Sequence, residues 1–201
     1  MQIVIYVLCA IGSYLLGSIS FASLFSKLIK HDDVREHGSG NAGTTNMIRT
    51  YGWGLGIATF VCDGLKGAIA VFVSHLLGGD IGLLLGSIFV VAGHNWPIFF
   101  KFRGGKGVAT TAGALAVMMP LETAIIFAFC LVIIAIWRLV SRASIIGAVL
   151  IIAAALIFHW GQVYMQAAII VMGVFMLIAH RSNMKRIIEN RENKLPLGKQ
   201  K

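Results

Sequence analysis

The chain has 201 residues, of which 58% are hydrophobic and only 12% are charged, and its formal net charge is +9. A soluble domain is about half apolar and about one quarter charged, so this chain has more apolar surface than one water-soluble core can bury. The composition excludes an ordinary soluble domain and indicates an integral membrane protein. The basic residues lie in short segments between apolar runs, which favours anionic lipids or anionic substrates as partners over nucleic acid.

Seven apolar runs follow one another along the chain. The expected spans are Ile3–Phe25, Trp53–Leu77, Ile81–Phe100, Val108–Met119, Thr123–Trp137, Ser144–Phe158 and Val163–Ala179. The fourth run is shorter than the roughly 17–25 residues that a span needs, and Pro120 ends it, so a half-span or a tilted helix stays open there. The sequence predicts an all-α polytopic integral membrane protein, one domain over residues 1–201 with seven transmembrane helices.

The charged residues predict how these spans are oriented. Lys and Arg follow the first, third, fifth and seventh spans, whereas the other connections carry Asp80, Glu122 and His159 and no Lys or Arg. Cytoplasmic loops are enriched in Lys and Arg. We therefore expect every Lys and Arg outside the spans on the cytoplasmic face of an inner membrane. The N-terminus is then outside and the C-terminus is in the cytoplasm.

The first basic connection, residues 37–49, combines glycines with small polar side chains. Its candidate ligand-binding residues are Ser39, Asn41, Thr45, Asn46 and Arg49. Glycines let the backbone bring N–H groups close to a ligand, and an arginine can hold a phosphate through two parallel hydrogen bonds. The segment therefore predicts contact with a phosphate group.

A second polar segment, residues 93–113, contains Gly104, Gly105, Lys106 and Gly107 at the expected start of a helix. Helix N-termini attract anions through their free N–H groups and the helix dipole, and Lys106 adds a positive charge. The pattern is not a Walker A motif, because a glycine follows the lysine, so ATP is not inferred. His94 in the same segment is read either as part of the site or as a helix end at the membrane interface.

The third polar segment follows the last span and contains His180, Asn183 and Glu192. His180 and Asn183 share one face if the helix continues, since residues three apart are neighbours on a helix. Within the second span, Asp63 and Lys66 have the same spacing, and a pair of opposite charges in lipid indicates a functional or supporting role. Leu195–Lys201 carries no recognisable chemistry and is expected to be mobile.

Three phosphate-binding segments on one face of a membrane protein imply an anionic substrate, with a lipid as one reactant. No cluster of His, Cys and Asp indicates a metal, and no organic cofactor is expected. The site is suited to positioning and charge stabilisation. Asp32, Asp33 and Glu36 leave open a lipid kinase that uses magnesium, although the flanking Lys30 and Arg35 favour a solvated charge cluster.

These segments resemble the signature motifs of the bacterial acyl-phosphate:glycerol-3-phosphate acyltransferase family (PlsY-type). The matching stretches are S-G-N-A-G-T-T-N-M-I-R at 39–49, D-G-L-K-G at 63–67, G-H-N-W-P-I-F-F-K-F-R-G-G-K-G-V-A-T at 93–110 and H-R-S-N-M-K-R at 180–186. The chain differs from the usual family pattern at Ala42, Trp96 and Asn190. Asn190 stands where glycine is frequent, and asparagine tolerates the left-handed backbone better than most residues.

The resemblance implies an enzyme that moves an acyl chain from acyl phosphate to the 1-hydroxyl of glycerol 3-phosphate, without acyl-CoA, giving lysophosphatidic acid and inorganic phosphate. It implies that a soluble enzyme supplies the acyl phosphate. Carried over to this chain, the glycerol 3-phosphate ligands are Ser39, Arg49, Lys106, His180 and Asn183, and the donor phosphate lies at Thr45, Gly104, Gly105 and Gly107. Either His180 or a substrate phosphate can take the hydroxyl proton.

Two rival functions remain at this level. A membrane transporter of a phosphate-bearing small anion would also use phosphate-binding loops, but it should place polar groups along a path that reaches both faces. The connections expected on the outer face are nearly bare of charge. A lipid-binding scaffold would explain the basic tail but not the glycine-rich loops.

Overall fold

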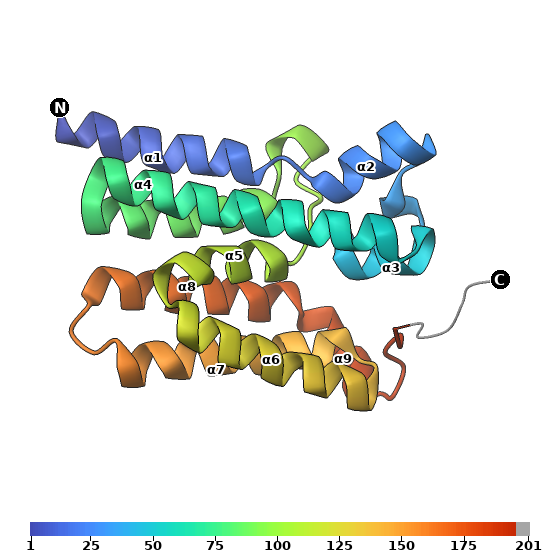
Figure 1. Ribbon diagram of the computed structural model, residues 1–201. Coiled ribbons are helices and arrows are strands. Elements are labelled where there is room, and N and C mark those ends of the chain that lie inside the picture. The colour runs from blue at the N-terminus through green and yellow to red at the C-terminus, as the bar shows by residue number, and fades with distance from the viewer. Residues whose placement is uncertain (196–201) are drawn as a thin grey trace.

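The structure, a computed structural model, describes residues 1–195, and its elements are all helical. They lie side by side in a bundle (Figure 1). The α-helices are α1 (Gln2–Gly17), α2 (Phe21–Lys30), α3 (Thr44–Tyr51), α4 (Trp53–Asn95), α5 (Val108–Met118), α6 (Pro120–Trp137), α7 (Val140–Phe158), α8 (Val163–Ala179) and α9 (Arg181–Ile188). Two short 3-10 helices, Val34–Glu36 and Ile98–Phe100, lie in the connections. Residues 196–201, which belong to the tail expected to be mobile, lie outside the described residues.

Four helical segments are long and apolar enough to cross a membrane: Gln2–Lys30, Trp53–Phe100, Pro120–Trp137 and Val140–Phe158. The pair α8 and α9 is a fifth candidate, bent by 53°, and α5 is apolar but shorter. The prediction of an all-helical membrane protein is thus confirmed. The fifth and sixth expected spans begin earlier than predicted, at Pro120 and Val140, and proline is well suited to the first position of a helix.

The expected span Trp53–Leu77 and most of the expected span Ile81–Phe100 lie within the single element α4, which ends at Asn95 and folds back on itself at Gly79. That glycine has φ 59° and ψ −143°, outside the helical region. A Cβ on Gly82 would lie 2.0 Å from the Ser74 carbonyl oxygen, and one on Gly86 would lie 3.0 Å from the Ala70 carbonyl oxygen. These contacts pair the segments 53–78 and 80–95 as two closely packed antiparallel arms.

The first expected span, Ile3–Phe25, lies within the candidate span Gln2–Lys30, but it is not one continuous helix, because the chain breaks between α1 and α2. Lys66 on α4 donates to the carbonyl oxygens of Gly17, at 2.9 Å, and Ile19, at 2.6 Å. Ser20 then caps α2 by accepting a hydrogen bond from the Ser23 N–H. The break is tolerated in apolar surroundings because the buried ammonium of Lys66, from another helix, binds the backbone carbonyls that lack a helical partner at the break.

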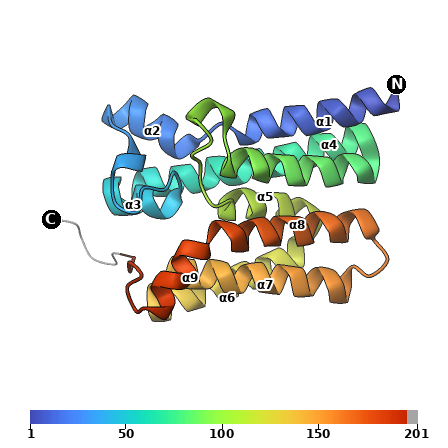
Figure 2. The same ribbon diagram turned by 180° about the vertical axis from the view of Figure 1, so that it is seen from behind.

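The bundle has two chemically different ends. The N-terminus, the fold-back of α4 and the connection from α7 to α8 lie at one end, and α2, α3 and α9 lie at the other (Figures 1 and 2). His159 Nε2 lies 3.3 Å from Glu122 Oε1, so two of the connections without Lys or Arg meet at the first end. The three polar segments gather at the opposite end, as the charge pattern predicts.

Candidate active site

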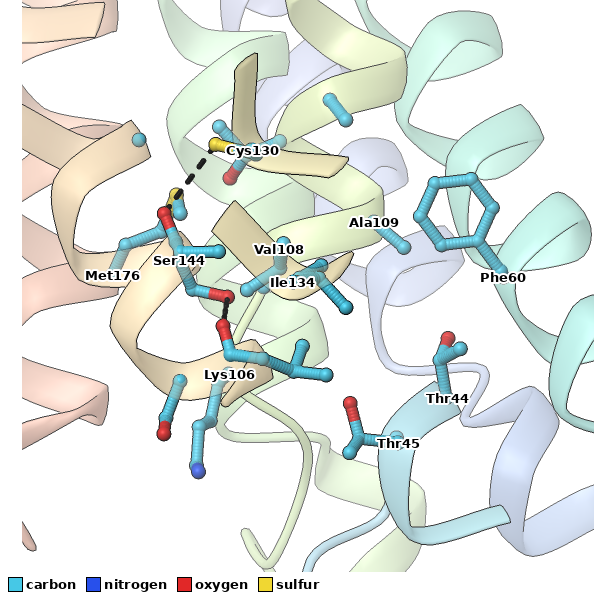
Figure 3. Close-up of a pocket in the computed structure, with 18 of the residues that line it drawn as sticks. Thr44, Thr45, Phe60, Lys106, Val108, Ala109, Cys130, Ile134, Ser144 and Met176 are labelled. Atoms are coloured by element: carbon cyan, nitrogen blue, oxygen red, sulfur yellow. Dashed lines mark hydrogen bonds between the residues drawn. The ribbon is translucent and has the colours of Figure 1, made fainter. Parts of the chain in front are cut away.

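A cavity of about 400 Å³ lies at the end of the bundle that carries the polar segments. Its polar end is lined by Ser39, Asn41, Thr45, Asn46, Arg49, Lys106, Gly107, His180, Asn183 and Glu192. From there it continues between helices as an apolar groove lined by Ile57, Phe60, Leu115, Ile126, Phe127, Leu131, Ile134, Ile151 and Met176. Figure 3 shows the junction of the two parts, with Lys106 below Val108 and Ile134, and Phe60 reaching in from α4.

Three helices begin at the polar end, one from each polar segment. They are α3 at Thr44, α5 at Val108 and α9 at Arg181. The first N–H groups of a helix have no partner within it, and they carry the positive end of the helix dipole. The sequence indicated only the start of α5, so the cavity has more capacity for anions than predicted.

Glycines allow the second segment to fold tightly against the end of α4. A Cβ on Gly104 would lie 2.1 Å from the His94 carbonyl oxygen, and one on Gly105 would lie 2.1 Å from His94 Nε2. Gly107 has φ 76° and directly precedes α5. The two packed glycines and the left-handed turn together bring Lys106 to the cavity. Gly105 and Gly107 line cavities, whereas Gly104 acts through its packing.

A chain of polar contacts connects the second segment to the third. Lys106 Nζ donates to Asn183 Oδ1 at 2.5 Å, and Asn183 Nδ2 donates to Glu192 Oε1 at 2.8 Å. Arg186 Nε donates to the other Glu192 oxygen at 2.7 Å. Burial, reinforced by the charges of Arg186 and Arg49, lowers the pKa of Lys106 to about 8 against the opposing effect of Glu192. The ammonium is therefore charged at neutral pH.

His180 lies at the bend between α8 and α9 and is 3% exposed. Its Nδ1 is 2.8 Å from the Met176 carbonyl oxygen. A carbonyl can only accept, so Nδ1 carries the proton of the neutral ring and Nε2 keeps a lone pair. Burial, with the nearby charge of Lys106, lowers the pKa of His180 to about 4. The helix does not run straight through His180 as the spacing argument assumed, yet His180 and Asn183 both line the cavity.

The first segment divides into groups that face the cavity and groups that hold the loop. Asn46 is 2% exposed: its Oδ1 accepts from the Ser39 N–H at 2.9 Å, and its Nδ2 donates to the carbonyls of Val34 and His37. Ser39 and Asn41 line the cavity and also a smaller adjoining pocket of about 250 Å³. Arg49 is half-buried and donates to the Asn193 carbonyl oxygen at 2.6 Å.

The intramembrane charges pair as their spacing predicts. Lys66 Nζ lies 2.8 Å from Asp63 Oδ1, with both side chains at most 2% exposed. His94 Nδ1 approaches the same oxygen at 3.5 Å, and the His94 carbonyl accepts from the Gly105 N–H at 3.1 Å. His94 lies one residue before the end of α4 and links this ion pair to the turn that carries Lys106, which favours the reading of it as part of the site.

Asp32 and Asp33, before the first segment, are held by partners in the same loop and in α3. Asp33 receives two hydrogen bonds from the Arg35 guanidinium, at 2.7 and 2.9 Å, and a third from the Arg35 backbone N–H, at 3.1 Å. The guanidinium lowers the pKa of Asp33 to about 2. Asp32 accepts from Tyr51 at 2.7 Å and lies 2.8 Å from His37. Over residues 1–195, no group of three or more His, Cys, Asp or Glu side chains is placed to hold a metal.

Two features of the site escaped the sequence reasoning. The apolar groove is assembled from five helices, α4 to α8, and the one-dimensional pattern of an all-apolar span does not say which of its faces lines a cavity. The tail also returns to the site. Leu195, expected to be mobile, is 5% exposed, lines the cavity and donates through its N–H to the Arg138 carbonyl oxygen at 2.8 Å.

The fold and the cavity define an integral membrane protein with a cation-lined site that opens into an apolar groove. Comparison of the sequence and the fold with known proteins identifies the family. The chain belongs to the glycerol-3-phosphate acyltransferase family, whose sequence profile matches residues 7–190.

Several relatives are similar to this chain over almost their whole length. A glycerol-3-phosphate acyltransferase from Thermoanaerobacter sp. (strain X514) is 40% identical over 189 residues, which cover 94% of this chain and 95% of the relative. One from Halalkalibacterium halodurans is 42% identical, with 94% of each chain covered. Crystal structures of PlsY (YgiH), an integral membrane glycerol 3-phosphate acyltransferase, superpose with TM-scores of 0.87 for the glycerol 3-phosphate form and 0.83 for the lysophosphatidic acid form. The glycerol 3-phosphate form is 35% identical in sequence, and the match covers 95% of this chain and 96% of that one. The lysophosphatidic acid form is 34% identical, and the match covers 94% of each chain.

Proposed function

We propose that this chain transfers a long-chain acyl group from acyl phosphate to the 1-hydroxyl of sn-glycerol 3-phosphate, with lysophosphatidic acid and inorganic phosphate as products. One observation carries the proposal: the cavity joins a polar end with a partly buried lysine, Lys106, to an apolar groove. Both substrates bear a phosphate, which suits the polar end of the cavity. The donor also bears a hydrocarbon chain, which suits the apolar groove.

The polar end divides between the two phosphates. Ser39, Arg49, Lys106, His180 and Asn183 hold glycerol 3-phosphate. The donor phosphate lies against Thr45, Asn41 and the turn of Gly104, Gly105 and Gly107, where α3 and α5 present first-turn N–H groups. Asn46 acts through Ser39, because its amide is used to fix that residue's backbone. Glu192 orients Asn183, and Asp63 with Lys66 supports the loop through His94.

The chemistry needs positioning more than a protein nucleophile. The glycerol hydroxyl oxygen forms the ester bond to the acyl carbon, and the bond from that carbon to the phosphate oxygen breaks. Phosphate is a good leaving group, and Lys106 and the helix N-termini stabilise the charge that it gains. With a pKa of about 4, His180 is a weak base, so it accepts a hydrogen bond from substrate and a phosphate oxygen takes the hydroxyl proton. No metal and no organic cofactor enters.

The two arms of α4 and the short helix α5 complete a count of seven transmembrane helices. We place the end with α2, α3 and α9, and with it the cavity, on the cytoplasmic side of the bacterial inner membrane, because the basic connections gather there. Glycerol 3-phosphate then enters from the cytoplasm, and a soluble enzyme that makes acyl phosphate supplies the donor. The basic tail contacts anionic membrane lipids.

Purified protein in detergent or lipid, without coenzyme A, tests the reaction directly. Palmitoyl phosphate and glycerol 3-phosphate should give lysophosphatidic acid and inorganic phosphate in equal amounts. Phosphate release should stop when glycerol 3-phosphate is omitted and in Lys106→Ala. Lys101→Ala, at an exposed lysine of the same connection that lines neither cavity, is the matched control. Folded protein that yields no product would refute the proposal, and glycerol-phosphate uptake into vesicles would then test the transporter alternative.

A further inference from the structure

The apolar groove has a narrow point where two aromatic rings meet across it. Phe60 from α4 and Phe127 from α6 both line the cavity, with ring centroids 5.8 Å apart and an angle of 31° between the ring planes. Within residues 1–195, α6 packs along α5 and α7 and has no extended interface with α4. The ring pair therefore bridges two helices that otherwise stand apart on the lipid-facing side of the groove.

The groove is more open on the side of the rings nearer to the polar end. Ile57 lies one turn before Phe60, and Leu131 lies one turn after Phe127; both line the cavity, yet they are 53% and 50% exposed. Phe60 is half-buried, and Phe127 is 40% exposed. The groove continues past the rings to Thr123 on α6. The rings are therefore a constriction within the groove and do not form its end.

The depth of this constriction can be related to the length of a bound chain. Ile134 lines the cavity together with Lys106 and with Val108, the first residue of α5. Phe127 precedes Ile134 by seven residues on α6, which is about 10 Å at the helical rise of ~1.5 Å per residue. An extended stearoyl chain whose carbonyl lies near Lys106 reaches this depth near its middle. A cis double bond in the middle of an oleoyl chain bends the chain at the same depth.

We propose that Phe60 and Phe127 select straight saturated acyl chains over chains bent by a cis double bond. The inference rests on the proposed function and assigns a substrate preference to the same site. A straight chain passes under the rings along the axis of the groove. A bent chain needs lateral room at that depth, which the two rings occupy, and protein interiors and grooves give way to such misfits only at a cost in free energy.

The test compares stearoyl phosphate and oleoyl phosphate, which have the same number of carbons, with octanoyl phosphate, which ends before the constriction. The variants are Phe60→Ala, Phe127→Ala and the double variant. Phe72→Ala on α4 and Phe129→Ala on α6 are matched controls, because these phenylalanines are 55% and 49% exposed and do not line the cavity. The readout is kcat/KM for each donor at saturating glycerol 3-phosphate.

In the wild-type protein, stearoyl phosphate should have the higher kcat/KM. Either truncation should lower the ratio of stearoyl to oleoyl kcat/KM by about tenfold, which is the size of a small steric change in an apolar pocket. The double variant should add little, since one missing ring already opens the bridge. Octanoyl phosphate and both control variants should keep wild-type values.

Two outcomes would overturn the inference. An unchanged ratio in both single variants would show that the rings do not contact the chain at its bend. An equal loss with all three donors would show that the rings only hold the helices together. Neither outcome touches the proposed function, which fails only if the wild-type protein transfers no acyl group from any of these donors.

Discussion

The charge of Lys106 depends on pH within the range in which an enzyme can be assayed. Its pKa is lowered to about 8 by burial and by neighbouring cations, so the ammonium is present below pH 8 and is lost as the pH rises through that value. Phosphate binding needs the charged form. We expect kcat/KM for glycerol 3-phosphate to fall above about pH 8, because this parameter reports groups of the free enzyme.

The matched variant is Lys106→Arg, in which the guanidinium stays charged throughout the accessible pH range. Its activity will be lower, since arginine has a different shape, but the alkaline fall should disappear. A fall at the same pH in Lys106→Arg would assign the titration to another group and contradict the role given to Lys106.

His180 is expected to bind and orient substrate and not to remove the proton. In His180→Asn, the shorter amide can still reach the Met176 carbonyl, but the acceptor at Nε2 is lost. The KM for glycerol 3-phosphate should rise several-fold, because a neutral hydrogen bond contributes about 0.5–1.5 kcal/mol, and kcat should change little. Steady-state kinetics at saturating donor measure both parameters. A large loss of kcat with an unchanged KM would show that His180 is the base.

At single positions, the sequence predicted the type of chemistry better than it predicted which partner each side chain binds. Asn190 is in the left-handed conformation, with φ 54°, which asparagine tolerates better than most residues. Asp63 and Lys66 form the ion pair that their spacing indicates. Asn46 shows the limit: its residue type suggested a ligand, but its hydrogen bonds are spent on the loop. Which partner a polar side chain takes depends on the tertiary fold, and the residue type alone does not determine it.

At the scale of elements, the broken first helix depends on a residue far along the chain. Lys66→Met removes the donor to the Gly17 and Ile19 carbonyls and leaves the carboxylate of Asp63 without its lysine. Breaking a buried ion pair on one side costs about 3–5 kcal/mol. We expect a clear fall in Tm of the detergent-solubilised protein, measured by thermal unfolding.

The double variant Asp63→Asn/Lys66→Met should recover part of that loss, since it leaves no uncompensated charge, although the two carbonyls remain without their donor. Lys101→Met, at an exposed lysine, should leave Tm unchanged. A Lys66→Met protein as stable as the wild type would refute the proposed support of the break.

The apolar runs predicted the positions of the helices, but they did not predict the breaks and bends between helices. Val163–Ala179 has the predicted bounds. The break after Gly17 lies within a continuous apolar run and depends on Lys66, which no local pattern reveals. Just after the bend at His180, Asn183 accepts a hydrogen bond from Lys106 of another segment, and no local pattern reveals this tertiary contact.

At the scale of the molecule, the basic residues determine the expected orientation. The pattern of charged connections predicted that the three polar segments share one end, and the structure places them together around one cavity. The apolar groove could not be predicted in the same way, because its walls come from faces of several helices that are apolar on all sides. Helices in lipid lack the polar face by which a soluble helix reveals its inside.

The orientation itself leads to a labelling experiment with two matched positions. Trp160, between α7 and α8, and Ile188, at the end of α9, are both 81% exposed and lie near opposite ends of the bundle. Each is changed to cysteine in a background in which Cys9, Cys62 and Cys130 are replaced by alanine. A membrane-impermeant maleimide should label Trp160→Cys in intact cells and Ile188→Cys only after lysis. The reverse pattern would place the cavity on the outer face, away from a cytoplasmic supply of glycerol 3-phosphate, and would contradict the proposed location of the site.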